Sequence, residues 1–417
     1  MVYEIKEFKV NDSITLKLEN NKTNIYIKGE LFQQCKYLLL NIPLEEANNI
    51  NSVDDIAENL DDSLHGRDGV VFDISPDVEF WAHSSNLQVW CEHSYDTRLL
   101  HSNLAFALLK KLAEIGDVIA RKKLKEEISK RYVFGNFKIK DFLSEEGFLD
   151  ILSKEELLSL VDEGDILLKL EQLVGQTLRI NTIKFPDPKG FVINKGLITW
   201  LSLDNCGLKK IPEIIKELKS LEGLIFKRNS LKTLPQWIGN STQLKYLDVS
   251  NNQLEDLPDS IGDLKNLKKL VLSNNKLKRL PESIGNLRKL ESLFIQHNKI
   301  KNLPESVGKL QTLKRLWISA NFLKSLPASI GKLKMLRELN ISDNQLDTLP
   351  KSIGLLSSLK FLIMGENPIR ELPSSINLLE SLETLSMGGI DESVWNLSDY
   401  MKKKVRIYKK KFESALL

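Results

Sequence analysis

Hydrophobic residues recur in the second half of the chain with a period of 23 residues. A ninth, incomplete copy begins at Leu382 and loses the pattern after Met387. Self-similarity at this spacing indicates a repeat architecture, in which neighbouring units bury each other's hydrophobic residues. The pattern is LxxLxLxxNxLxxLPxxIGxLxx, and full copies begin at Ile198, Leu221, Leu244, Leu267, Leu290, Leu313, Leu336 and Leu359.

Each copy predicts a short strand followed by a turn and a short helix. In LxxLxL the last two leucines alternate with polar residues, as in a strand with one buried face. A recurring asparagine, from Asn229 to Asn367, can bond backbone groups that would otherwise be buried unpaired. A recurring proline, from Pro212 to Pro373, cannot continue a strand and suits the entrance to a helical turn. Stacked units then form one parallel sheet with helices or turns on its other side.

The repeat resembles the leucine-rich repeat, over residues 190 to 390. Its LPxxIGxLxxL ending is similar to that of plant Ras-group-related repeats, animal Ras-pathway scaffolds and many prokaryotic proteins. The resemblance implies a curved α/β solenoid whose concave sheet binds other proteins, which in some members are small GTPases or phosphatases. The resemblance does not identify contact residues in this chain, because the concave positions vary freely between members of the family.

Three positions depart from the pattern. Cys206 replaces the asparagine of the first copy, and we interpret it as a structural end-repeat substitution whose thiol is still a weak donor. In the second copy Ser241 replaces a core leucine and Trp237 stands where other copies have serine. We favour volume compensation on the convex side over a partner contact through Trp237.

The third, fifth and seventh residues of each copy are predicted to point out of the sheet, because strand side chains alternate. Phe294 and Trp317 both occupy the fifth position, so they should lie about 5 Å apart on neighbouring strands. We favour an interface, rimmed by charged residues that include Arg337 and Glu338, over rings that only cover the sheet. The main alternative is that the N-terminal domain of the same chain folds back onto these residues. The predicted partner-binding residues are Tyr246, Lys269, Val271, Phe294, Arg315, Trp317, Phe361 and Ile363.

The first 175 residues lack the repeat. The segment SITLKLENNKTNIYIKGE predicts two strands around Asn20 and Asn21, and residues 51–95 are predicted to be irregular. Helical spacing begins at Thr97 on both sides of Gly116, which resembles a single HEAT-type pair, and two short helices follow Ser153. We expect regions at 1–96, 97–175, 176–197 (linker and cap), 198–381 (eight repeats) and 382–417 (degenerate repeat, cap and basic tail).

Terminal repeats need covers, because their open edge exposes leucines. FPDPKGFVINKG predicts a linker and a small strand that shields the first copy. Trp395 and Leu397 are candidates to plug the last copy, followed by a tail with seven Lys or Arg between Lys402 and Lys411. We favour a capping helix with a solvated basic face; contact with acidic lipid or nucleic acid is the alternative.

Composition is that of an ordinary soluble protein, with 42% hydrophobic and 28% charged residues and a net charge of +3. The charge gives no argument for nucleic acid. The start MVYEIKEFKV resembles no secretory signal, and no run of roughly 18 apolar residues predicts a membrane span. Three scattered cysteines favour a reducing cytoplasm.

Candidate chemistry is sparse. His83, Cys91, His93 and His101 cluster in the sequence, but their spacing matches no usual zinc pattern, and a Cys91 nucleophile is the weaker alternative. Neither GxxxxGK[ST] nor GxGxxG occurs, so no phosphate-binding loop is predicted. No cysteine follows Cys206, unlike in bacterial ubiquitin ligases that carry similar repeats before a catalytic domain.

We therefore predict an interaction scaffold: an α+β domain followed by a leucine-rich repeat solenoid. We expect a monomer in the cytoplasm that uses no cofactor or metal and binds a protein on the concave face, with a small GTPase as a candidate. The alternative places an unrecognised enzyme in residues 1–175, with the repeats selecting its substrate. A spacer or self-association surface is a third possibility.

Overall fold

The computed structural model divides the chain into two compact units. Unit 1 comprises Met1–Tyr132 and Phe142–Ser153, and unit 2 comprises Val133–Asp141 and Lys154–Leu417. The structure describes residues 6–34, 75–100, 102–135, 139, 143, 147–159, 161, 163–181, 189–391, 393 and 395–408.

Unit 1 contains a four-stranded antiparallel sheet in the order β1-β2-β3-β4. The predicted hairpin is confirmed, because β2 and β3 are joined at Asn20 and Asn21. These residues have φ angles of 52° and 62°, the left-handed backbone that a tight two-residue hairpin requires. The strands are β1 (Lys6–Lys9), β2 (Ile14–Glu19), β3 (Lys22–Ile27) and β4 (Glu30–Gln34).

Helix α2 (Pro76–Glu92) packs against β2 and β3. The prediction of irregular structure was therefore wrong for residues 76–92, while residues 51–74 lie outside the described part. The buried face of α2 includes His83 and Ser84 beside Phe80, Leu87 and Trp90. Two polar residues on that face weaken the apolar periodicity on which a helix prediction depends.

The other predicted helices are confirmed. In unit 1 the turn at Gly116 separates α3 from α4, whose last two residues belong to unit 2. Ser153, the last residue of unit 1, is followed directly by α6, which belongs to unit 2. The elements are η2 (Thr97–Leu99), α3 (Ser102–Glu114), α4 (Val118–Phe134), η3 (Phe148–Ile151), α6 (Lys154–Leu158) and α7 (Gly164–Val174).

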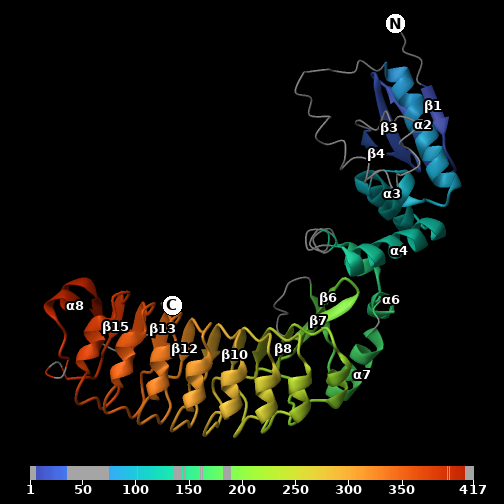
Figure 1. Ribbon diagram of the computed structural model, residues 1–417. Coiled ribbons are helices and arrows are strands. Elements are labelled where there is room, and N and C mark those ends of the chain that lie inside the picture. Colours follow the sequence, from blue (N-terminus) through green and yellow to red (C-terminus); the bar gives the residue numbers. More distant parts are fainter. Residues whose placement is uncertain are drawn as a thin grey trace, which may run out of the picture. The chain divides into compact units, whose positions relative to one another are not determined.

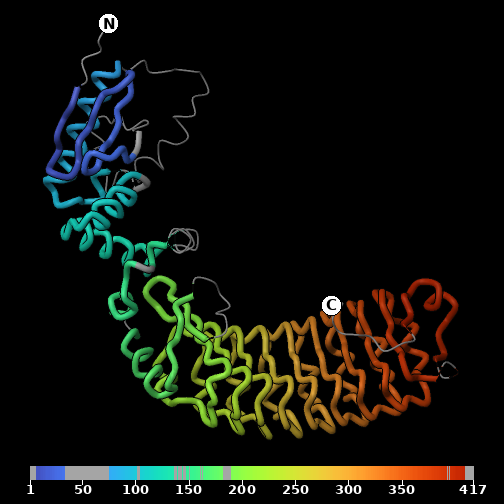
Figure 2. The backbone as a smooth tube through the Cα atoms, turned by 180° about the vertical axis from the view of Figure 1, so that it is seen from behind, coloured from blue at the N-terminus to red at the C-terminus, as the bar shows by residue number. Residues whose placement is uncertain are grey.

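The repeats of unit 2 form successive turns of one coil, which Figures 1 and 2 show from opposite sides. Their strands make a 12-stranded sheet that is parallel except between β6 and β7. The strands are β5 (Arg179–Asn181), β6 (Lys189–Asn194), β7 (Leu197–Leu203), β8 (Gly223–Ile225), β9 (Tyr246–Asp248), β10 (Lys269–Val271), β11 (Ser292–Phe294), β12 (Arg315–Trp317), β13 (Glu338–Asn340), β14 (Phe361–Ile363), β15 (Thr384–Ser386) and β16 (Arg406–Tyr408).

A 3₁₀ turn begins directly after the recurring proline of each repeat from Pro212 to Pro373, as predicted from the proline column. These turns stack closely: a Cβ added to Gly285 would lie 2.5 Å from the carbonyl oxygen of Ser306. Trp237 lies half-buried in one of them. The turns are η4 (Glu213–Glu217), η5 (Gln236–Asn240), η6 (Asp259–Asp263), η7 (Glu282–Asn286), η8 (Glu305–Lys309), η9 (Ala328–Lys332), η10 (Lys351–Leu355) and η11 (Ser374–Leu378).

The asparagine column bonds one repeat to the next, as predicted. Asn298 Oδ1 accepts a hydrogen bond from the Leu277 backbone N–H at 3.0 Å. Its Nδ2 donates to the carbonyl oxygens of Leu272 and Ile295, each at 3.0 Å. Where Cys206 replaces this asparagine, the thiol donates to the carbonyl oxygen of Asp204 at 3.5 Å.

Both ends of the repeat sheet are covered. At the N-terminal end β6 pairs antiparallel with β7, which confirms the predicted shielding strand. At the C-terminal end Trp395 and Leu397 are buried and α8 (Asp399–Lys404) follows them. The predicted capping helix is therefore present, but β16 then adds one more parallel strand, which the prediction missed. No helix in the described part of the chain is long and apolar enough to cross a membrane.

Candidate protein-binding face of the repeats

The outward face of the repeat sheet, here called the concave face, carries the predicted residues. Along β11 the side chain of Leu293 is fully buried, whereas Phe294 is half-buried on the other side of the sheet. The same alternation places Val271 and Trp317 on the concave face. Phe294 therefore lies in a solvent-facing position and not in the leucine core.

Phe294 and Trp317 form an aromatic pair on neighbouring strands. Their backbones are directly opposite in the parallel register, and Val271 is opposite Phe294 on the other side. The two ring centroids are 5.1 Å apart and the rings are inclined at 76°. Such an edge-to-face arrangement is favourable beyond simple burial, by roughly 0.5–1.5 kcal/mol.

Lys269 lies between two aromatic rings. Its Nζ is 5.3 Å from the centroid of Tyr246 and 5.4 Å from that of Phe294. Burial lowers the pKa of Lys269, and the charge of Arg315 lowers it further, against a smaller opposite effect of Asp248. Cation–π attraction keeps the ammonium group in this place despite the loss of hydration.

Trp200 extends the row of rings in a way that sequence reasoning missed. Its indole lies over Gly223, where an added Cβ would fall 2.0 Å from the ring. The indole centroid is thus brought to 5.5 Å from that of Tyr246, two repeats further on. A tryptophan followed by glycine at the same position of the next repeat was the available signal. We call Tyr246, Lys269, Val271, Phe294 and Trp317 the aromatic patch.

Arg315 reaches across the face at the third position of its repeat. Its side chain is exposed, and Nε donates a hydrogen bond to Ser292 Oγ at 3.2 Å. Ser292 itself is 3% exposed, so the arginine side chain lies over it. Glu338 is directly opposite Arg315 on the other neighbouring strand, but the two form no ion pair within 4.0 Å.

The last two predicted residues lie apart from the aromatic patch. Phe361 and Ile363 are on β14, which is separated from β12 by β13. Phe361 is half-buried, whereas Ile363 is only 6% exposed and offers little surface to a partner. The structure therefore brings together the residues from Tyr246 to Trp317 and leaves β14 at a distance.

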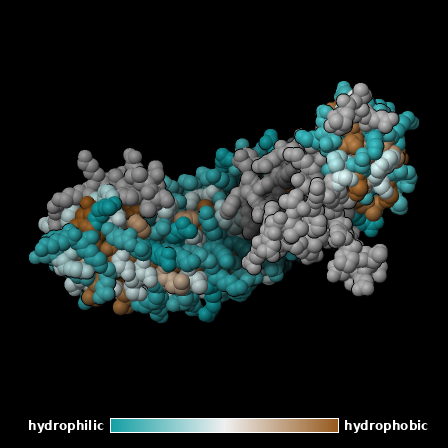
Figure 3. All heavy atoms as spheres, turned by 90° about the horizontal axis from the view of Figure 1, so that it is seen from above, coloured by the Kyte–Doolittle hydropathy of each residue, from teal (hydrophilic) through white to brown (hydrophobic). Residues whose placement is uncertain are grey.

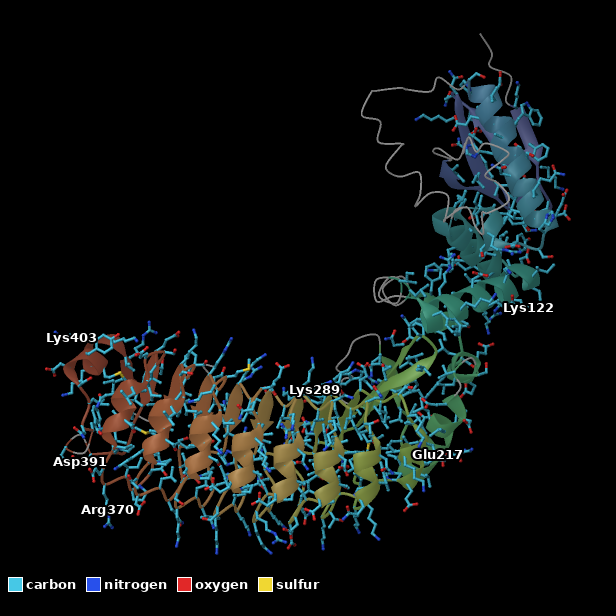
Figure 4. All side chains as sticks on the ribbon, in the orientation of Figure 1. Lys122, Glu217, Lys289, Arg370, Asp391 and Lys403 are labelled. Atoms are coloured by element: carbon cyan, nitrogen blue, oxygen red, sulfur yellow. The ribbon has the colours of Figure 1, made fainter. Side chains whose placement is uncertain are left out.

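The rims of the repeats differ from the concave face in composition. Charged side chains follow both rims, with Lys289 on one and Arg370 on the other (Figure 4). In the view of Figure 3 the surface of the repeats is mostly hydrophilic, with hydrophobic residues only in scattered places.

The residues considered for catalysis in unit 1 do not form a site in the described part of the chain. Burial raises the pKa of the Cys91 thiol to about 12, with smaller contributions from the charges of Asp117 and Glu92, which disfavours a nucleophilic thiolate. Burial lowers the pKa of His83, whose Nε2 is 3.4 Å from Glu79. No three metal-ligating side chains gather among the described residues, and His101 lies outside them.

Unit 1 also contains a cavity of about 490 Å³. Neither His83, Cys91 nor His93 contributes to its wall. Charged residues predominate in it, and several of them pair with each other, including Asp96 with Arg98. The lining residues are Asp96, Thr97, Arg98, Lys123, Glu127, Lys130 and Arg131.

Comparison with known proteins finds leucine-rich repeats in unit 2. A family model described as "Leucine-rich repeat region" matches residues 236–322 and 307–403, and one described as "Leucine rich repeat" matches residues 197–254. No curated protein matches the chain.

Similar solved structures cover about half of the chain. A leucine-rich repeat protein of Leptospira interrogans is 29% identical, over 51% of this chain and 65% of its own, with a TM-score of 0.39. The ectodomain of the Arabidopsis thaliana receptor kinase GASSHO1/SCHENGEN3, solved with CASPARIAN STRIP INTEGRITY FACTOR 2, is 27% identical, over 52% and 31%, with a TM-score of 0.43. The present chain thus spans less than two thirds of the length of these proteins.

Proposed function

Because residues 197–403 form a leucine-rich repeat solenoid, we propose that the protein is a scaffold that binds a protein partner on its concave face. Leucine-rich repeat proteins generally mediate protein–protein interaction. The observation that carries the proposal is the edge-to-face pair of Phe294 and Trp317, half-buried on a sheet face, with Lys269 between Phe294 and the ring of Tyr246. Aromatic anchors of this kind dominate the energetics of protein interfaces.

The geometry also supports tight recognition without rearrangement. The rings stand on hydrogen-bonded strands whose opposite faces are packed with fully buried leucines such as Leu293 and Leu316. Residues held in this way lose little conformational entropy when a partner binds. We expect binding to leave the backbone of the repeats unchanged.

The proposal is tested by capturing partners on the purified wild-type chain and on a Phe294→Ala/Trp317→Ala variant. A Phe322→Ala/Met335→Ala variant is the matched control, because these two side chains are 43% and 44% exposed but lie outside the strands. We expect the strand variant to lose affinity for a specific partner about 30-fold or more, measured by titration calorimetry, and the control to bind normally. Equal recovery by all three proteins would refute the proposed face.

We further propose that the partner is a small GTPase and that the protein acts as a monomer in the cytoplasm. The LPxxIGxLxxL ending, similar to that of small-GTPase-associated repeats, is the support for the partner class. Binding of a purified GTPase should depend on its nucleotide and on Phe294. Capture of only other proteins by the aromatic patch would exclude this class and leave the scaffold function intact.

A further inference from the structure

A second cation, Arg315, lies two strands from Lys269 of the aromatic patch. Lys269 on β10 and Arg315 on β12 occupy equivalent positions, with Ser292 of β11 between them in the register. Arg315 is turned back toward Ser292, to which it donates at 3.2 Å. Ser292 has a small side chain and is 3% exposed, so the larger side chains of Lys269 and Arg315 carry the accessible polar groups here.

Among the described residues, two carboxylates near these cations are bound to other groups. Glu291 is paired with Lys314 Nζ at 2.7 Å, which lowers the pKa of Glu291, and the charge of Arg315 helps to lower it. Asp248, the acid that acts on Lys269, already accepts hydrogen bonds from the Ser250 N–H at 2.9 Å and the Tyr246 hydroxyl at 3.3 Å. Neither Lys269 nor Arg315 forms an ion pair within 4.0 Å with any described residue. The charge of Arg315 lowers the pKa of Lys269, so the two cations disfavour each other, and an incoming anion would reduce this repulsion.

We infer that Lys269, Ser292 and Arg315 form an anion notch that takes a carboxylate of the partner protein, next to an apolar side chain that packs on Phe294 and Trp317. The inference deepens the proposed function and rests on it. The planar guanidinium of Arg315 can bind a carboxylate through two parallel hydrogen bonds, and Lys269 adds a point charge. The rings beside the notch exclude water, which strengthens both interactions.

A protein segment fits this face better than a nucleic acid. Binding of nucleic acid uses a basic stripe with many phosphate contacts. The notch contains only two cations, Lys269 and Arg315. The surrounding concave face also carries acidic residues, among them Asp204, Asp248 and Glu338. This mixture disfavours a polyanion and suits a single carboxylate in an otherwise apolar contact.

The inference is tested by selecting a displayed library of random linear peptides on the full chain. The test variant is Lys269→Gln/Arg315→Gln, which also removes the repulsion between the two charges and should therefore fold. Lys299→Gln/Lys301→Gln is the matched control, because both lysines are exposed and lie in the same repeat as Ser292, after the end of β11. Phe294→Ala/Trp317→Ala tests the proposed function in the same experiment.

Wild type and the lysine control should enrich peptides with Asp or Glu close to an aromatic or aliphatic residue. The notch variant should bind the selected peptides about ten- to a hundred-fold more weakly, because a charge-assisted hydrogen bond is lost. Binding should also weaken as salt is added.

Other outcomes overturn one claim or both. Peptides that need Phe294 and Trp317 but contain no acidic residue, or bind the notch variant normally, refute the notch and leave the proposed function standing. Absence of enrichment, or enrichment indifferent to the two rings, contradicts the proposed function as well. Tighter binding of a labelled single-stranded oligonucleotide, or self-association that Lys269→Gln abolishes, would assign the notch to a different occupant.

Discussion

The two units of the protein are stabilised in different ways. In unit 2 the same contacts recur through the inner repeats: a buried leucine column, an asparagine that bonds the previous turn and a glycine that admits the next one. In unit 1 each contact occurs once, and the core depends on a few large side chains, among them Trp90, Tyr132 and Phe80. A repetitive core distributes its stability over many similar contacts, whereas a unique core concentrates it.

The contrast also separates two kinds of surface. In unit 2 the regular strands present side chains in register, so that residues 23 apart in sequence become neighbours and can build a binding face. In unit 1 exposed hydrophobic residues such as Leu31, Trp81 and Val118 stand on different elements, β4, α2 and α4, without such repetition. A regular scaffold is thus what turns scattered residues into a contiguous patch.

The largest effect should come from the unique core. Trp90 is fully buried in α2 and its ring centroid lies 4.8 Å from that of Tyr95. We expect Trp90→Ala to lower the free energy of unfolding of unit 1 by about 3–5 kcal/mol, because it removes a large ring and leaves a cavity. Hydrogen exchange followed by mass spectrometry should show the loss in peptides from residues 75–132.

Trp81→Ala is the control on the same helix, because Trp81 is 52% exposed. It should cost well under half as much. Equal losses of stability for Trp81→Ala and Trp90→Ala would mean that unit 1 does not depend on a few large buried side chains, and would contradict the contrast between the two units.

A smaller effect is expected in the repeats. Asn298→Ala leaves the Leu277 N–H and the carbonyl groups of Leu272 and Ile295 without the side-chain partner. We expect a loss of about 2–3 kcal/mol, measured by hydrogen exchange and confined to the repeats around Asn298, because each repeat contacts only its neighbours. Asn302→Ala, at an exposed position of the same repeat, should change little. A uniform loss of protection over the whole solenoid would contradict local stabilisation.

The smallest effect concerns a charge pair in unit 1. The Arg98 guanidinium lowers the pKa of Asp96 to about 2, aided by the Arg98 backbone N–H and opposed by partial burial. Because the folded pKa lies below its ordinary value of 3.8, the stabilisation is complete above about pH 4 and is lost as the pH falls toward 2.

Asp96→Asn should therefore cost up to about 1 kcal/mol at neutral pH, because the ion pair with Arg98 is lost while asparagine can still cap the turn, and nothing below about pH 2. Denaturant unfolding of the full chain at several pH values measures the difference. Arg98→Gln should also lower stability at neutral pH, and the double variant should lose less than the sum of the two single variants. A difference between wild type and Asp96→Asn that is independent of pH would exclude this pair as its source.

Much of unit 2 followed from the sequence because its signals are redundant. The proline, asparagine and leucine columns each predict the same register, so Phe294 and Trp317 could be placed side by side in advance. Unit 1 offered weaker signals: Asn20 and Asn21 predicted a hairpin, but His83 and Ser84 concealed the helix α2. A buried polar residue belongs to a helix face only in a particular tertiary context, which a single sequence does not display.

The sequence by itself determined the repeat, the faces of its strands and the neighbours of each side chain along the sheet, because leucine burial and backbone hydrogen bonding repeat every 23 residues. Only the tertiary structure decided where those side chains turn. Arg315 lies over Ser292 and not toward Glu338, and Trp200 occupies the space that Gly223 leaves open. The periodicity of the sequence determines the course of the backbone, whereas the volume and charge of neighbouring side chains select each rotamer. The geometry of the candidate site depends on these rotamers.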